Sequence, residues 1–148
     1  MAVQRGHNCG MESVRRILQI LRIGMLVSIA LYAFIGERVG HGVAAPNHGV
    51  YFALTLVAIT TVGMIFAVRR VFVLRSEPTL AVQPDDGAAL SRWRTGYIAI
   101  YALSESVALF GLVLRILGFT LSEVAPFYLA GFALMLVFGP RPPDASSG

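Results

Sequence analysis

Glu105 is the side chain of this sequence with the clearest potential for chemistry. It lies near the middle of the apolar run GYIAIYALSESVALFGLVL, residues 96–114. A charge at the centre of a membrane helix costs roughly 2.5–3.5 kcal/mol on insertion scales, so a carboxyl there indicates a functional site by default. Desolvation disfavours the ionised form, so we expect Glu105 to be largely protonated unless a partner lies nearby. A carboxyl that exchanges its proton is what a proton- or cation-binding site requires.

Polar side chains on the same predicted helix are the first candidates to complete such a site. Tyr101 lies one turn before Glu105 on the same helical face, so its hydroxyl is well placed to bond the carboxyl. Ser104 and Ser106 flank it, pointing about 100° to either side. The predicted ion-binding set is therefore Glu105, Tyr101, Ser104 and Ser106, and we expect neither a metal ion nor another cofactor.

The arginines nearest to this carboxyl are poorly placed as counter-ions. Arg115 lies about 15 Å further along the helix axis. We expect it to reach the membrane interface and to form an ion pair with Glu123 across a short turn. Arg22, in the first apolar stretch, would need a favourable helix tilt to reach Glu105.

The composition indicates a membrane protein. Hydrophobic residues make up 56% of the chain, more than the 45–50% or so of ordinary soluble domains. Four apolar stretches approach the ~20 residues needed to cross ~30 Å of hydrocarbon. We expect an all-α polytopic membrane protein, a single membrane domain of four transmembrane helices in two hairpins. The helices are predicted at about 15–36, 49–72, 95–117 and 120–139, with a loop at about 73–94.

The basic residues of this chain are all arginines, and they cluster at the ends of the apolar stretches. By the positive-inside rule, this pattern places both termini and the loop at about 73–94 in the cytoplasm. It predicts a multi-pass protein of a bacterial inner (plasma) membrane, with the lipid bilayer rather than nucleic acid as its surroundings. The clustered arginines are Arg5, Arg15, Arg16, Arg22, Arg69, Arg70, Arg75, Arg92, Arg94 and Arg141.

Few other residues offer chemistry. Cys9 is the only cysteine, so an intrachain disulfide is excluded. His41 and His48 lie in the first loop with Glu37 as the nearest carboxylate, and solvated histidines are favoured over a metal site there. No nucleophile–base constellation or glycine-rich phosphate loop is present, so we do not expect an enzyme. Translation starts at Met1 or at Met11.

Two steps of small residues could let membrane helices approach closely. They are Gly24-x-x-x-Ser28 in the first predicted helix and Gly63-x-x-x-Ala67 in the second. Small residues four positions apart share one face of a helix and allow a neighbouring backbone to pack against it.

A short resemblance to a known family begins at Glu105. Residues 105–112, Glu-Ser-Val-Ala-Leu-Phe-Gly-Leu, resemble the carboxylate-bearing helix of rotary ATPase proteolipid (c-type) subunits. The resemblance implies that Glu105 is an ion-binding carboxyl and that Gly111 is a close-packing position. The predicted second helix lacks the repeated Gly-x-Gly pattern of the partner helix in those subunits. The overall layout resembles small, uncharacterised four-helix bacterial integral membrane proteins, which implies no particular activity.

Three functions follow from these features. The favoured one is a non-catalytic structural or assembly subunit of a membrane complex, either a homo-oligomer or an assembly with other membrane subunits. In that case Glu105 pairs with a polar group within the bundle or on a partner. The second is a proton- or cation-translocating subunit that cycles Glu105. The third is a small-molecule exporter similar to the small multidrug class.

Overall fold

The structure of the protein is a computed structural model, which describes residues 4–39, 47–83 and 86–139. These ranges contain helices and turns, and no strand. The elements are α1 (Gln4–Val39), α2 (His48–Val68), the π-helical turn η1 (Arg69–Val73), α3 (Glu77–Val82), α4 (Gly87–Ile116) and α5 (Leu121–Val137). Three helices, α1, α2 and α4, are long and apolar enough to cross a membrane, and α5 is a shorter apolar helix. The expected all-α architecture is confirmed, and three of the four predicted spans are long and apolar enough to cross a membrane.

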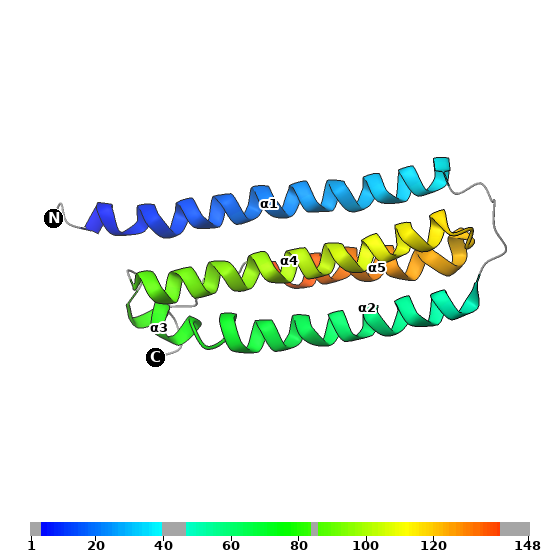
Figure 1. The fold of residues 1–148 in the computed structure, drawn as a ribbon. Helices are drawn as coiled ribbons and strands as arrows, with labels where there is room; N and C mark the ends of the chain where they lie inside the picture. The colour runs from blue at the N-terminus through cyan, green and yellow to red at the C-terminus, as the bar shows by residue number, and fades with distance from the viewer. Residues whose placement is uncertain (1–3, 40–46, 84–85, 140–148) are drawn as a thin grey trace.

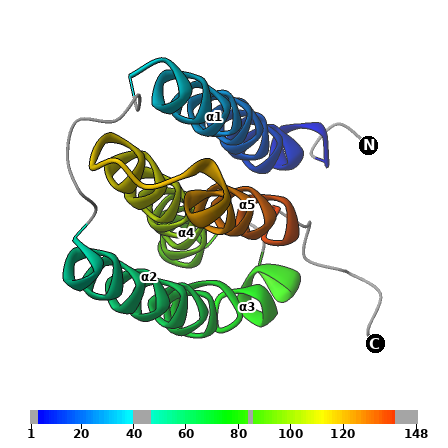
Figure 2. The same ribbon diagram turned by 90° about the vertical axis from the view of Figure 1, so that its right-hand side faces the viewer.

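The four long helices run side by side and alternate in direction (Figure 1). α4 and α5 form a central pair, and α1 and α2 lie on opposite sides of that pair (Figures 1 and 2). α4 contacts each of the other helices. The start of α1, the start of α4 and the short helix α3 lie at one end of the bundle, which we call the α3 end, and α5 stops short of it (Figure 1).

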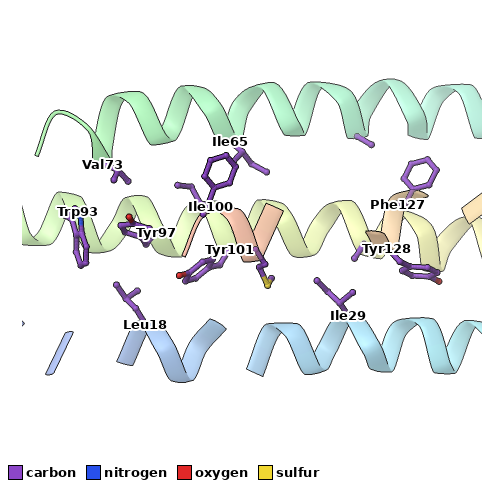
Figure 3. Packing of buried hydrophobic residues seen from close by; sticks show 14 of the residues in the cluster. Leu18, Ile29, Ile65, Val73, Trp93, Tyr97, Ile100, Tyr101, Phe127 and Tyr128 are labelled. Atoms are coloured by element: carbon purple, nitrogen blue, oxygen red, sulfur yellow. The ribbon is translucent and has the colours of Figure 1, made fainter. Parts of the chain in front are cut away.

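Burial distinguishes α4 from the helices around it. In the most apolar stretch of α4, 44% of the residues are buried inside the protein, against 11% in the corresponding stretches of α1 and α2. Side chains converge on α4 from both sides: Leu18 and Ile29 from α1, Ile65 and Val73 from α2 and η1 (Figure 3). α4 is therefore the core helix of the bundle.

Glycines set the closest approach of α4 and α5. A Cβ atom on Gly131 of α5 would lie 2.8 Å from the backbone oxygen of Ser104 in α4. A Cβ atom on Gly111 of α4 would lie 3.0 Å from Cβ of Phe127 in α5. The bilayer provides no hydrophobic force between helices, so helix association depends on close packing. Small residues permit that packing because they let the two backbones approach. The resemblance implied a packing role for Gly111, and the structure places it at this crossing.

The segment between α2 and α4 differs from the predicted loop at about 73–94. η1 continues α2 and packs against α4, where a Cβ atom on Gly96 would lie 2.9 Å from Cβ of Phe72. α3 follows, and α4 already begins at Gly87 rather than near residue 95. The Asp86 carboxylate accepts hydrogen bonds from the backbone N–H groups of Ala88 and Ala89. This is an N-cap, which starts α4 inside the segment that was predicted as a loop.

The first helix also differs from its prediction. α1 begins at Gln4 and ends at Val39, whereas the apolar pattern predicted about 15–36. Hydropathy marks the part of a helix that suits lipid, and a helix can continue through polar residues on either side of that part. The second and fourth helices, predicted at about 49–72 and 120–139, agree within a few residues with α2 plus η1 and with α5.

Candidate functional site

One face of α1 brings polar side chains to the α4–α5 pair. Its inward residues recur at alternating spacings of four and three, the pattern of a heptad seam between packed helices. We call this set the α1 seam. Some of its members are fully buried, and others are polar and partly exposed. They are Leu18, Arg22, Met25, Ile29, Tyr32 and Gly36.

Glu105 of α4 lies against the seam at Tyr32. The Tyr32 hydroxyl in α1 donates a hydrogen bond to Glu105 Oε1 in α4, with an oxygen–oxygen distance of 2.7 Å. This distance is typical of a good O–H···O bond. Both side chains are partly buried. The intramembrane carboxyl therefore has a partner within its own chain, on a different helix from the residues that the sequence suggested.

The three other members of the predicted ion-binding set lie in other environments. The Tyr101 hydroxyl is buried and has no hydrogen-bond partner within the described residues, so it does not bond Glu105 as we expected. The hydroxyls of Ser104 and Ser106 donate to backbone oxygens of their own helix, those of Ile100 and Ala102, at 2.8 and 2.9 Å. Such bonds to position i−4 satisfy serines locally. These three hydroxyls are not gathered around the carboxyl.

The ion pair predicted between Arg115 and Glu123 is replaced by another. Arg115 Nε lies 3.1 Å from Oε1 of Glu37 at the end of α1. Its Nη1 donates to the backbone oxygen of Phe119 at 2.8 Å. Glu123 instead accepts hydrogen bonds from the backbone N–H and the hydroxyl of Thr120 and caps α5. Glu123 lies at the third position of α5, where a capping box needs its carboxylate, and this local role competes with the ion pair.

Gly36 lets this outer ion pair form. A Cβ atom at Gly36 would lie 3.0 Å from the hydroxyl oxygen of Tyr128 and 3.1 Å from Cγ of Arg115. The glycine therefore makes room for two side chains of the α4–α5 pair against α1. The Tyr128 hydroxyl is buried, without a hydrogen-bond partner among the residues described.

Between Glu105 and the α3 end, Arg22 of the seam meets the end of α5. Its Nη2 donates to the backbone oxygen of Leu136 at 3.2 Å. A Cβ atom on Gly139 would lie 2.7 Å from Nη1 of Arg22. A cation at a helix C-terminus interacts favourably with the exposed carbonyl groups there. Arg22 therefore caps α5 and does not serve Glu105. Its Nε is buried and unpaired within the described ranges.

The histidines offer no metal site in the described ranges. His48 packs edge-on against Phe119, with ring centroids 6.4 Å apart, and His41 lies outside the described residues. No three His, Cys, Asp or Glu side chains gather anywhere in residues 4–39, 47–83 and 86–139.

An apolar groove of about 300 Å³ lies between α2, α4 and α5. Its lining includes Tyr51, Thr55, Val107 and Phe127, and Glu105 is not part of it. The Thr55 hydroxyl donates to the backbone oxygen of Tyr51 at 2.8 Å. The groove is thus separate from the intramembrane carboxyl.

No protein-family model, curated protein or solved structure matches this chain. The fold and the polar seam are therefore the basis for any functional conclusion.

Sequence reasoning missed two functional partners, Tyr32 and Glu37. The signal for Tyr32 was present, because the heptad spacing from Leu18 to Gly36 places it on the inward face of α1. Glu37 follows directly after the last seam residue. Hydropathy alone did not reveal either residue, because it carries no information about which face of a helix points inward.

Proposed function

We propose that this protein is a non-catalytic structural or assembly subunit of a membrane complex, and that Glu105 serves its own bundle. The observation that carries this proposal is the hydrogen bond of 2.7 Å from Tyr32 to Glu105. It joins α1 to α4 and satisfies the carboxyl inside the chain. A polar group in the bilayer needs such a partner, and a hydrogen bond between helices provides both satisfaction and attachment.

The other polar groups of α1 support the same role. Arg22 binds the last turn of α5 and Glu37 pairs with Arg115. Together with Tyr32, they attach α1 to the central pair at three levels. Because these polar side chains are engaged in contacts between helices, they favour a structural role over a catalytic one.

The outward faces of α1 and α2 support a partner. A Cβ atom on Gly24 or on Gly63 would meet nothing within 4 Å, so both small-residue steps face away from the bundle. On α2, Ala53, Thr60 and Ala67 are exposed at seven-residue spacing. Small outward residues of this kind suit close packing by a transmembrane helix of another subunit.

The orientation we propose follows the arginines. Arg16, Arg22 and Arg75 lie on the segments that meet at the α3 end, as do Arg92 and Arg94 at the start of α4. The positive-inside rule then puts the α3 end in the cytoplasm, with both termini there, in a bacterial inner membrane.

Site-specific cross-linking in native membranes tests the assembly role. Cys9 is replaced by serine, and a single cysteine is placed at Gly63 or at Ala67. The matched control is Leu129→Cys, an exposed position on α5. We expect one discrete adduct from the two α2 positions and none from the control. Equal, diffuse labelling at all three positions would exclude a specific partner on this face.

A proton- or cation-translocating subunit is the second candidate, favoured by one observation. Tyr101 Oη and Arg22 Nε are buried and unpaired within the described residues, and the Tyr32–Glu105 pair belongs to the same interface. Unsatisfied buried polar atoms suit a path for water or protons. Proton flux into vesicles that Glu105→Gln abolishes would favour this candidate, and unchanged flux would remove it.

A further inference from the structure

A second pocket lies at the α3 end, away from the α1 seam. It has a volume of about 350 Å³ and lies between η1, α3 and the first turns of α4. Its lining combines charge and apolar surface. The residues that matter here are Arg75, Arg92, Ser76, Thr79, Phe72 and Asp86.

Two arginines give the pocket its chemistry. Arg75 follows η1 and Arg92 lies on the second turn of α4, so two separate segments bring them to one cavity. Both are exposed, and neither has a hydrogen bond or ion pair with any residue that the structure describes. Other arginines are engaged: Arg115 pairs with Glu37, and Arg69 lies over the ring of Phe138. Two unpaired guanidinium groups on one cavity suit an anion with several oxygens.

Among the described residues, one acidic group also lines the pocket, and its role is local. Asp86 Oδ1 accepts from the backbone N–H groups of Ala88 and Ala89 at 2.9 and 3.2 Å. This carboxylate caps α4 and lies against the positive end of the helix dipole. Two guanidinium groups against one engaged carboxylate give the described lining residues a net positive charge.

The other walls suit a ligand at a membrane surface. Phe72 and Val71 provide an apolar side, and the Thr79 hydroxyl adds a polar one. The pocket lies between the last part of one candidate membrane span, His48–Leu80, and the first turns of another, Gly87–Ile116. At such a depth, phosphate groups of lipids and soluble phosphates are the abundant anions.

We propose that this pocket binds a phosphate group through Arg75 and Arg92. The phosphate comes from an anionic phospholipid headgroup or from a soluble phosphate compound. This site is independent of Glu105 and of the assembly role proposed above. Because each basic residue near an anionic surface contributes about 1 kcal/mol, loss of one arginine should weaken binding about fivefold, and loss of both about 25-fold.

The single tryptophan provides a local reporter. Trp93 is adjacent to Arg92 in α4, so a brominated lipid held in the pocket should quench its fluorescence. The protein is placed in phosphatidylcholine nanodiscs and titrated with brominated phosphatidylglycerol or, in parallel, brominated phosphatidylcholine. A second arm measures binding of radiolabelled inorganic phosphate by equilibrium dialysis, at ionic strength held constant with sodium chloride.

Three variants make the test specific. Arg75→Gln with Arg92→Gln should abolish the preference for the anionic probe. Arg94→Gln is the matched control, because it removes the same charge from the same helix at a residue that does not line the pocket. Asp86→Asn should bind the anion a few-fold more tightly, because asparagine caps a helix as well as aspartate and carries no charge.

Quenching that prefers phosphatidylglycerol and depends on Arg75 and Arg92 would assign the phosphate to a lipid. Binding of inorganic phosphate with the same dependence would assign it to a soluble compound. Either result supports the site. An equal loss in Arg94→Gln, or binding of neither probe, would overturn it, provided that the melting temperatures of the variants match that of the native protein.

Discussion

α2 and α4 have nearly the same hydropathy and opposite roles. The mean hydropathy of their most apolar stretches is 2.1 and 1.8, yet 11% of the residues in one and 44% in the other are buried. Within the bilayer, apolarity does not drive helices together, because lipid chains are as apolar as leucine. Small residues and polar groups decide which helix becomes the core. α4 places Gly96, Ser104, Gly111 and Glu105 against its neighbours, whereas most small residues of α2, among them Gly63 and Ala67, face outward.

The largest expected effect comes from placing a valine at a glycine of the α4–α5 contact and, for comparison, at an outward glycine of α2. Gly131→Val would bring a Cβ to 2.8 Å from the Ser104 backbone oxygen. Backbone cannot yield as a flexible side chain does, so we expect a loss of about 3 kcal/mol of unfolding free energy in detergent. Gly63→Val, with nothing within 4 Å, should change it by much less. Equal losses in the two variants would contradict the assignment of α4 and α5 as the core pair.

Removal of one hydroxyl tests the polar seam. Tyr32→Phe deletes the donor to Glu105 and leaves the carboxyl without that bond, so we expect a loss of about 1 kcal/mol. Tyr51→Phe on α2 is the control, because the ring of Tyr51 packs against the rings of Phe119 and Phe127 rather than an acidic group. Unfolding free energies of the two variants give the comparison, and a larger loss in Tyr51→Phe would reverse it.

The outer ion pair should have a smaller effect. The Glu37 side chain is 46% exposed, so the pair with Arg115 should contribute about 0.5 kcal/mol. A double-mutant cycle of Arg115→Gln with Glu37→Gln should show this coupling. The same cycle with Glu123→Gln should show none, because Glu123 bonds Thr120 instead. Coupling to Glu123 alone would restore the pair that the sequence suggested.

The outward face of α2 should have the smallest effect on folding. Ala67→Leu adds bulk where α2 is exposed, so we expect the unfolding free energy of the isolated protein to change by less than about 0.5 kcal/mol. In native membranes the same variant should lose the cross-link from a cysteine at Gly63. If the variant keeps the full yield of adduct, no partner packs closely on this face of α2.

The sequence was sufficient for the class of the protein and for the position of Glu105. Apolar runs of the right length predicted the helices, because helix length follows bilayer thickness. It did not predict the first turns of α4, because the Asp-Gly pair at 86–87 is as typical of a loop turn as of a helix N-cap. It also misassigned the partners of Glu105 and Arg115. Those partners, Tyr32 and Glu37, lie on a helix distant in sequence, and only helix packing brings them near.

The most direct test of the central claim is a double-mutant cycle between Tyr32 and Glu105. Unfolding free energies are measured in detergent for Tyr32→Phe, Glu105→Leu and the double variant. If the carboxyl serves the bundle through Tyr32, the two substitutions should be coupled by about 1 kcal/mol. Additive effects, with no coupling beyond about 0.3 kcal/mol, would contradict the structural role of Glu105.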